Sequence, residues 1–168
     1  MRRVLVPSDG SANSQYGVRH VVNEFMKNPD VDIHVLNVQG PLSKRVAQFT
    51  SNRVQMEFLQ ERAGKALEPA RQLLDRYGIT YTVHTEVGDK ADCIVDAARR
   101  LRCDRIVMST ARKSSLVRLV EHSVTNQVIA RTTVPVEVIA GDAASSLERV
   151  GIPAGIGASL LGLALAVN

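Results

Sequence analysis

The sequence predicts an α/β fold in a single domain, a doubly wound sheet of five parallel strands with helices on both faces. Two observations carry this prediction. Short apolar runs alternate along the chain with longer segments in which apolar residues recur at helical spacing. The short runs are apolar on both sides, as strands are when helices cover both faces of a parallel sheet. A chain of 168 residues suits one such domain with a short extension.

The strands are short and end at residues that interrupt extended structure. Pro7 closes the first strand, Gly40-Pro41 ends the second, and Gly88-Asp89 turns the chain after the third. The fifth run contains Pro135, which has no N–H, so we expect it at the start of its strand or facing away from the ladder. The predicted strands are 4–6, 31–38, 79–87, 106–108 and 134–139.

The helices are predicted from apolar stripes. The polar turn at 8–11 offers several N-cap residues before the first helix. A long helix at 53–77 contains Pro69, where the loss of one hydrogen bond predicts a kink. Shorter helices are predicted at 91–101 and 123–131. The expected core residues of the helices are Val18, Val21, Val22, Phe25, Met26, Phe58, Leu59, Leu67, Leu73, Leu74, Ile94, Ala97, Ala98 and Leu101.

Charge and cysteine content argue against several classes of function. The chain has 21 Lys and Arg against 17 Asp and Glu, the basic residues are scattered, and there is no Trp, so no nucleic-acid partner is expected. Cys93 and Cys103 form no CxxC motif, and no His pair has metal-ligand spacing. We therefore expect free thiols and no metal site. Residues 1–4 run into a strand without a signal peptide, which predicts a cytoplasmic protein.

The loops after the first and fourth strands, 7–11 and 109–122, are the candidate binding loops. In open α/β sheets ligands bind at the carboxyl ends of the strands, where the strand order reverses. Neither loop has the acidic cluster of a receiver domain or the SGGxDS motif of a PP-loop pyrophosphatase. His20, His34 and His84 fall within a helix or strands, so no catalytic residue is predicted and the protein is not expected to be an enzyme.

Three segments taken together resemble the universal stress protein family. They are VLVPSDGS at 4–11, VGDKADCIVDAARRLRCDRIVMS at 87–109 and HSVTNQVIARTTVPVEVI at 122–139. The resemblance covers about 1–140. It implies the strand order 3-2-1-4-5 and a homodimer formed by antiparallel pairing of the fifth strands. One branch of the family binds ATP, and another, the A-type branch, does not.

The glycine motif of the ATP-binding branch is altered in this chain. That branch carries G-x2-G-x9-G-[ST] after the fourth strand. Its glycines fall on Ser109, Arg112 and His122, while Ser123 matches the final hydroxyl. Glycine lets backbone N–H groups approach phosphate closely, and a residue with a Cβ in the left-handed conformation costs about 1–2 kcal/mol. The chain therefore resembles the A-type branch, and we expect no ATP binding tighter than about millimolar.

Part of the family's nucleotide pocket is kept. Asp9 matches the acidic residue that lies near the nucleotide in the ATP branch, and Val38 matches the apolar position on the adenine side. Arg112, Lys113 and Ser123 are good partners for an anion. Three interpretations stay open: no physiological ATP and no other cofactor, weak or altered binding of an adenine nucleotide, or a different small ligand.

The leading hypothesis is a non-catalytic, dimeric stress-response protein that acts through contacts with an unknown protein partner. The alternative is an adenine-nucleotide-binding regulatory module with a modified phosphate loop. The fifth strand is apolar and last in the sheet, so we expect Val134, Val136 and Val138 to pair with a second copy.

The domain is predicted to end at residue 141, before a linker and apolar tail at 142–168. Residues 150–167 carry no charge. This stretch lies at the short end of the roughly 17–25 residues that span a bilayer, and it lacks an anchor at its far end. Burial against protein is therefore favoured over insertion into a membrane.

Overall fold

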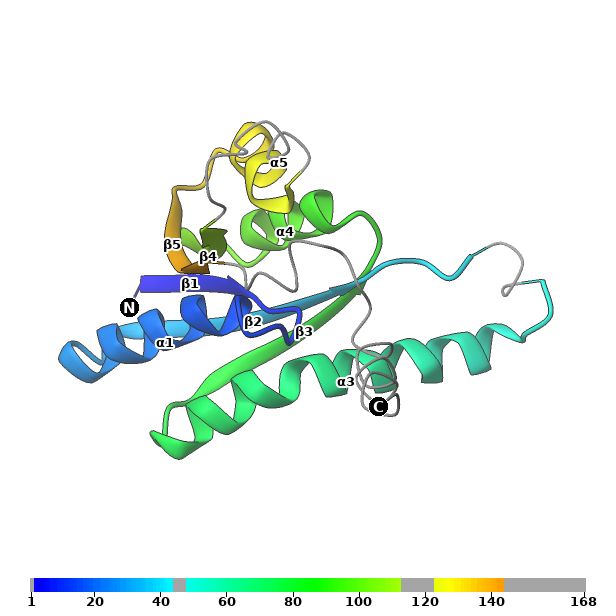
Figure 1. Cartoon of the computed structure of the whole chain (residues 1–168), viewed down its shortest axis with the longest axis horizontal. Helices are drawn as coiled ribbons and strands as arrows, with labels where there is room; N and C mark the ends of the chain where they lie inside the picture. The colour runs from blue at the N-terminus through cyan, green and yellow to red at the C-terminus, as the bar shows by residue number, and fades with distance from the viewer. Residues whose placement is uncertain (1, 44–47, 113–122, 144–168) are drawn as a thin grey trace, which may run out of the picture.

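The computed structural model describes residues 2–43, 48–112 and 123–143, without the side chains at 111–112 and 142–143. Helices and strands alternate along the chain (Figure 1). The elements are β1 (Arg2–Pro7), α1 (Ser14–Lys27), β2 (Val31–Gln39), α3 (Asn52–Arg76), β3 (Tyr81–Val87), α4 (Lys90–Arg100), β4 (Arg105–Arg112), α5 (Val124–Arg131) and β5 (Val136–Ala143).

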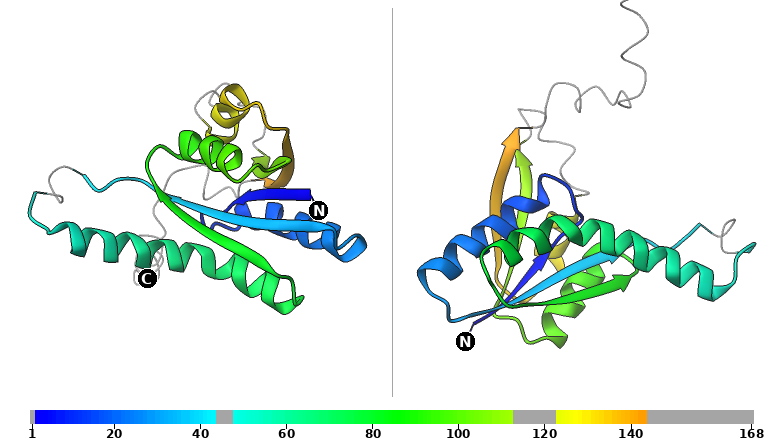
Figure 2. Two further views of the ribbon diagram at one scale, coloured as in Figure 1. Left: turned by 180° about the vertical axis from the view of Figure 1, so that it is seen from behind. Right: turned by 90° about the horizontal axis from the view of Figure 1, so that it is seen from below.

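The five strands form one parallel sheet in the order β3-β2-β1-β4-β5, which confirms the predicted fold class. In Figure 1 the sheet lies between α4 and α5 above and α1 and α3 below, and Figure 2 shows the same layers from behind and from below. We call these the α4/α5 face and the α1/α3 face. The order reverses at β1, whose neighbours β2 and β4 lead away in opposite directions.

Each face of the sheet carries its own apolar core. On the α1/α3 face, alternate residues of β1 and β2 pack against the stripes of the two helices. On the α4/α5 face, Leu5, Leu36 and Ile106 pack against α4 and α5. The α1/α3 core consists of Val4, Val6, Val18, Val21, Val22, Val31, Ile33, Val35, Leu67, Ala70, Leu74, Ile79 and Val107.

Local sequence explains where the helices begin. Ser51 accepts a hydrogen bond from the Val54 N–H at the start of α3, and Asp89 accepts from the N–H groups of Ala91 and Asp92 at the start of α4. α3 is assigned as one helix through Pro69, and the kink expected there stays a prediction.

Two expected core residues are exposed instead. Met26 is 60% exposed and Phe58 is 47% exposed. Met26 lies about a quarter turn from the centre of the buried stripe of α1, and Phe58 lies on the outer side of α3, away from Leu59. The guanidinium of Arg62 lies over the Phe58 ring, 5.7 Å from its centre. Both predictions were wrong because the buried stripe of each helix is narrower than the set of apolar residues that recur at helical spacing in its sequence.

All five strands differ from their predicted ranges by one or more residues, and β4 and β5 differ most. β4 runs to Arg112, beyond the predicted end at 108, because Ser109 and Thr110 pair with β5. β5 begins at Val136, so Val134 precedes the strand, and it continues through Ala143. The predicted tail lies outside the described residues from 144 onward.

Candidate functional site

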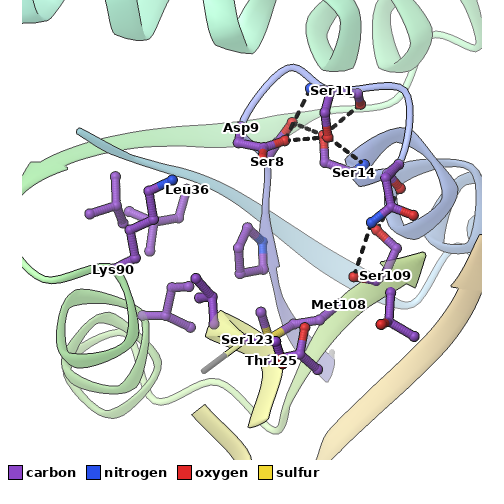
Figure 3. Close-up of a pocket in the computed structure, with 16 residues that line it drawn as sticks. Ser8, Asp9, Ser11, Ser14, Leu36, Lys90, Met108, Ser109, Ser123 and Thr125 are labelled. Atoms are coloured by element: carbon purple, nitrogen blue, oxygen red, sulfur yellow. Dashed lines mark hydrogen bonds between the residues drawn. The ribbon is translucent and has the colours of Figure 1, made fainter. Parts of the chain in front are cut away.

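A cavity of about 260 Å³ opens where the strand order reverses, at the carboxyl ends of β1, β2 and β4 (Figure 3). It lies between the loop after β1 and the first residues of α4 and α5. This is the position at which open parallel sheets bind ligands. The lining residues are Pro7, Ser8, Asp9, Ser11, Asn13, Ser14, Leu36, Val38, Lys90, Ile94, Met108, Ser109, Thr110, Ser123, Val124 and Thr125.

The loop after β1 packs directly against the backbone of α3. Gly10 has φ +81°, and a Cβ added there would lie 2.8 Å from the carbonyl oxygen of Ala66. A side chain at this position would therefore face both a strained backbone conformation and a clash with a helix. Gly10 allows the loop to turn over the cavity while α3 lies against its outer side.

Asp9 is held at the rim of the cavity by the residues that follow it. Its Oδ1 accepts hydrogen bonds from the Ser11 N–H at 3.0 Å and the Ser11 hydroxyl at 2.6 Å (Figure 3). The Ser11 oxygen in turn accepts from the N–H of Ser14 at the start of α1, at 3.1 Å. Asp9 thus supports the turn before α1 through Ser11 and does not cap the helix directly.

The pKa of Asp9 lies below its usual value. Partial burial is the largest single effect and raises the pKa. The two hydrogen bonds from Ser11, with smaller contributions from Ser14 and the charge of Lys90, together outweigh it. The carboxylate is therefore ionised near neutral pH. Both bonds from Ser11 reach Oδ1. Because each carboxylate oxygen can accept more than one hydrogen bond, the carboxylate keeps acceptor capacity for a ligand.

Ser109 of β4 lines one end of the cavity and is hydrogen-bonded to Asn13, the residue before α1. Its hydroxyl donates to the carbonyl oxygen of Asn13 at 2.6 Å, and the Asn13 side-chain amide donates to the Ser109 carbonyl at 3.4 Å. The only proton of the Ser109 hydroxyl is thereby used within the protein. Ser109 also pairs with Ile139 of β5, so its backbone belongs to the sheet.

Ser123 closes the cavity at the start of α5. Its oxygen accepts from the N–H of Asn126 at 3.2 Å, which makes it the N-cap of the helix. A hydroxyl acts as donor and acceptor at the same time, so Ser123 can accept from Asn126 and still donate to a ligand.

Among the described residues, the opposite wall is apolar and carries one cation. Leu36 and Val38 of β2 lie with Ile94 of α4 and Met108 of β4. Lys90, the first residue of α4, lies on this side, across the cavity from Ser109 (Figure 3). One half of the cavity thus suits a flat apolar group, and the other half offers hydroxyls and a carboxylate.

The structure brings four of the six predicted site residues together. Asp9, Val38, Ser109 and Ser123 all line the cavity. Arg112 lies in β4, but the structure describes only its backbone. His122 lies outside the described residues.

Sequence reasoning missed several lining residues, above all Lys90. Its signal was available, because Lys90 directly follows the predicted third strand and turn and so had to lie at the same edge of the sheet. Asn13 and Thr125 were also missed. Their contribution depends on how the helix starts are placed in space.

The described residues offer little sign of other chemistry. Within them, no group of three or more His, Cys, Asp and Glu side chains is arranged to hold a metal ion. No described helix is both long and apolar enough to cross a membrane. His20 contacts Glu137 at 2.8 Å and His34 contacts His84 at 3.0 Å, and none of the three lines the cavity.

Comparison with solved structures supports the fold. The structure of hypothetical protein MJ0577 has a TM-score of 0.67 and 24% identity, and the match covers 85% of this chain and 98% of that one. A universal stress protein in complex with cAMP has a TM-score of 0.63 and 20% identity, covering 82% and 96%. One from Archaeoglobus fulgidus in complex with dAMP has a TM-score of 0.57 and 21% identity, covering 83% and 98%. At these identities the likeness shows the fold.

Sequence comparison shows the family. Universal stress protein MJ0531 of Methanocaldococcus jannaschii is 29% identical over 142 residues, which cover 82% of this chain and 81% of that protein. The sequence model described as the universal stress protein family matches residues 1–140. This match spans both loops of the cavity and all five strands up to the middle of β5. The chain therefore belongs to the universal stress protein family.

Proposed function

We propose that the chain is a non-catalytic, dimeric, cytoplasmic regulatory protein. Its cavity binds an adenosine compound that carries a single phosphate group, and it does not bind ATP tightly. The observation that carries the proposal is the division of the cavity into an apolar wall and a polar wall, together with the side chains at the family's glycine positions. Solved family members in complex with cAMP and dAMP support a ligand of this size.

The apolar wall suits a purine base. Leu36, Val38, Ile94 and Met108 together offer an apolar surface at the edge of the sheet. Ligand sites of this kind combine such a surface with a few polar groups that fix orientation. Asp9 is the acceptor best placed for the hydroxyls of a ribose, because it is ionised and a carboxylate can accept further hydrogen bonds beside those from Ser11.

The far end of the cavity is unsuited to a triphosphate. Ser109 carries a side chain where the ATP-binding branch has glycine, and its hydroxyl is bonded to Asn13. Residues 109, 110 and 112 pair with β5, so their backbone takes part in the sheet ladder. Phosphate cradles use free backbone N–H groups that approach the ligand closely. The described cavity, about 260 Å³, is also near the lower end of ligand pockets, which span roughly 300–1,000 Å³.

The cavity nevertheless offers a positive charge for one phosphate group. Lys90 is a cation at the cavity wall, and Ser123 and Thr125 line the wall near the start of α5. A phosphate within reach of Lys90 would receive a charge-assisted hydrogen bond from its ammonium group. We therefore assign a nucleoside monophosphate, cyclic or open, as the ligand class.

The dimer part of the proposal rests on β5. This strand lies at the edge of the sheet beside β4, and Val138 is 41% exposed there. Pairing with a second copy would cover an edge that otherwise invites aggregation. Val134 and Val136 pack partly against the α4/α5 core, so we propose Val138 as the main apolar contact.

Calorimetry with adenosine, AMP, cAMP and ATP tests the proposed function. We expect AMP or cAMP to bind at least about tenfold more tightly than ATP, a difference of about 1.4 kcal/mol. Lys90→Gln should weaken AMP binding and leave adenosine binding unchanged. Lys65→Gln is the matched control, because Lys65 lies on α3 and pairs with Glu61.

Two results would contradict the proposal. Micromolar binding of ATP by the unaltered protein would show that the altered loop still holds a triphosphate. Absence of binding for every adenosine compound, with no adenine nucleotide found by mass spectrometry in gently purified protein, would show that the cavity serves another ligand or none.

A further inference from the structure

Two amide side chains are buried in β2, close to the cavity but behind it. Asn37 is 1% exposed and Gln39 is 7% exposed. Residues at alternate positions of a strand share a face, so both lie with Val35 on the α1/α3 face, whereas Leu36 and Val38 face the cavity. Neither amide lines the cavity.

Asn37 binds the chain where β1 leaves the sheet. The Ser8 N–H donates to the Leu36 carbonyl at 2.8 Å, as the next bond of the parallel ladder requires. The Ser8 carbonyl then accepts from the Asn37 side-chain nitrogen at 2.7 Å. In a continuing ladder a backbone N–H of β2 would occupy this position. The side chain of Asn37 thus supports the departure of the loop from the sheet.

The orientation of the Asn37 amide is determined by its neighbours. A carbonyl oxygen only accepts, so the NH₂ end of Asn37 must face Ser8. Its Oδ1 then accepts from the Gln39 side-chain nitrogen at 2.6 Å. Gln39 is itself anchored through its backbone carbonyl, which accepts from the Gly88 N–H at 3.0 Å. A chain of hydrogen bonds therefore runs from the turn after β3 to the loop after β1.

We propose that Asn37 is a positioning residue of the cavity, which holds the Ser8 carbonyl and thereby sets the place of the Asp9 carboxylate, with Gln39 fixing the orientation of Asn37. Ser8 is 3% exposed and is joined to Asp9 by a single peptide bond. A shift of the Ser8 carbonyl therefore moves the carboxylate directly. The expected effect on ligand affinity rests on the proposed function. The effect on the placement of Asp9 does not, because it can be measured in the protein without a ligand.

The first experiment compares AMP binding by Asn37→Leu and Val35→Ala. Both positions are buried on the same face of β2, but Val35 has no bond to the loop after β1. Asn37→Leu leaves the Ser8 carbonyl without its partner, and we expect AMP binding to weaken by about tenfold or more. Val35→Ala should lower the melting temperature without this loss. An affinity change in Asn37→Leu no greater than in Val35→Ala overturns the inference.

A milder variant covers the case in which Asn37→Leu does not fold. Gln39→Leu keeps the bond to Ser8 but removes the partner that orients Asn37. We expect a smaller weakening of AMP binding, by a factor of about 3, in a protein that still folds. Unchanged affinity in a folded Gln39→Leu protein counts against the inference.

The second experiment follows the titration of the Asp9 carboxyl by NMR in the free protein. The pKa of Asp9 is below its usual value in the unaltered protein, largely because Ser11 donates to the carboxylate against the effect of burial. If Asn37 positions this loop, the pKa of Asp9 rises toward its usual value in Asn37→Leu, or in Gln39→Leu, and stays low in Val35→Ala. An unchanged Asp9 titration refutes the inference. Failure of every adenosine compound to bind would refute the proposed function alone.

Discussion

The hydroxyl of Ser109 donates a hydrogen bond to the carbonyl oxygen of Asn13 at 2.6 Å, and so joins the end of β4 to the residue before α1. The Asn13 amide returns a bond to the Ser109 carbonyl at 3.4 Å. The serine at a family glycine position therefore has a structural role of its own. Gly141 of β5 allows this contact, because an added Cβ there would lie 2.3 Å from the Asn13 side-chain oxygen.

Introducing glycine at the three positions that match the glycines of the ATP-binding branch should strengthen ATP binding. We expect the unaltered protein to bind ATP no more tightly than about millimolar, near −4 kcal/mol. The triple change of Ser109, Arg112 and His122 to Gly removes side chains from the loop and frees its backbone for phosphate. Calorimetry measures the gain.

Ser109→Gly alone is the control for that experiment. It breaks the bond to Asn13 and adds backbone freedom, so we expect it to reduce the free energy of unfolding by about 1–2 kcal/mol. A triple variant that folds and binds ATP no better than the unaltered protein would show that the glycines are not what limits affinity.

Gly10→Ala should be strongly destabilising, whereas Gly64→Ala should be neutral or stabilising. Gly10 has φ +81°, and its added Cβ would meet the Ala66 carbonyl at 2.8 Å. Gly64 lies inside α3, and apart from its chain neighbours and the helix's own backbone no described atom lies within 4 Å of an added Cβ. We expect a loss of about 1–3 kcal/mol at Gly10 and a gain of about 0.5–1 kcal/mol at Gly64. Urea unfolding of both variants measures the difference, and equal stabilities would contradict the placement of Gly10 against α3.

Val138→Lys should convert the proposed dimer to a monomer without unfolding the domain. Val138 is 41% exposed on β5, whereas Val136 packs partly against the core and is less suited to the test. A lysine at a strand edge opposes pairing. Ile129→Lys, at a 49% exposed position on α5, is the control and should leave the dimer intact. Sedimentation decides between them, and a monomeric unaltered protein at micromolar concentration would refute the dimer.

The His34–His84 pair predicts loss of stability in mild acid. The two rings form a hydrogen bond of 3.0 Å, and the other His34 nitrogen faces Asp32 at 3.3 Å. Burial first, then the charges of His34 and Arg100, lower the pKa of His84 below its usual 6.5, against the opposing effect of Glu86. His84 therefore binds a proton more tightly in the unfolded chain than in the folded protein. The free energy of unfolding does not change through this group above about pH 6.5, and it decreases as the pH is lowered further.

His84→Gln should reduce this dependence on pH. Between pH 7.5 and 5.5 we expect the unaltered protein to lose more stability than the variant, because only the unaltered protein has the lowered pKa of His84. His20→Gln is the control, because His20 lies on α1 and contacts Glu137. Asp9 also has a lowered pKa, but its effect appears only near pH 4 and below. Identical pH profiles for His84→Gln and the unaltered protein would contradict the prediction.

The sequence by itself determined the sheet, the edge at which the cavity lies and the family. Each strand could be recognised from a short apolar run and the turn residues that end it, and these are local properties. Asp9, Val38, Ser109 and Ser123 could be placed near one another because the carboxyl ends of parallel strands share an edge. The strand order came from the resemblance of three segments to the family.

Only the tertiary structure decided which side chains line the cavity and which hydrogen bonds hold them in place. The bond between Ser109 and Asn13 joins residues 96 positions apart, and the support of Ser8 by Asn37 joins residues 29 positions apart. Lys90 reaches the cavity because α4 starts at its edge, and Phe58 is exposed because α3 turns it away from the sheet. Such contacts depend on how helices and strands pack in three dimensions, which the pattern of residues along the chain does not contain.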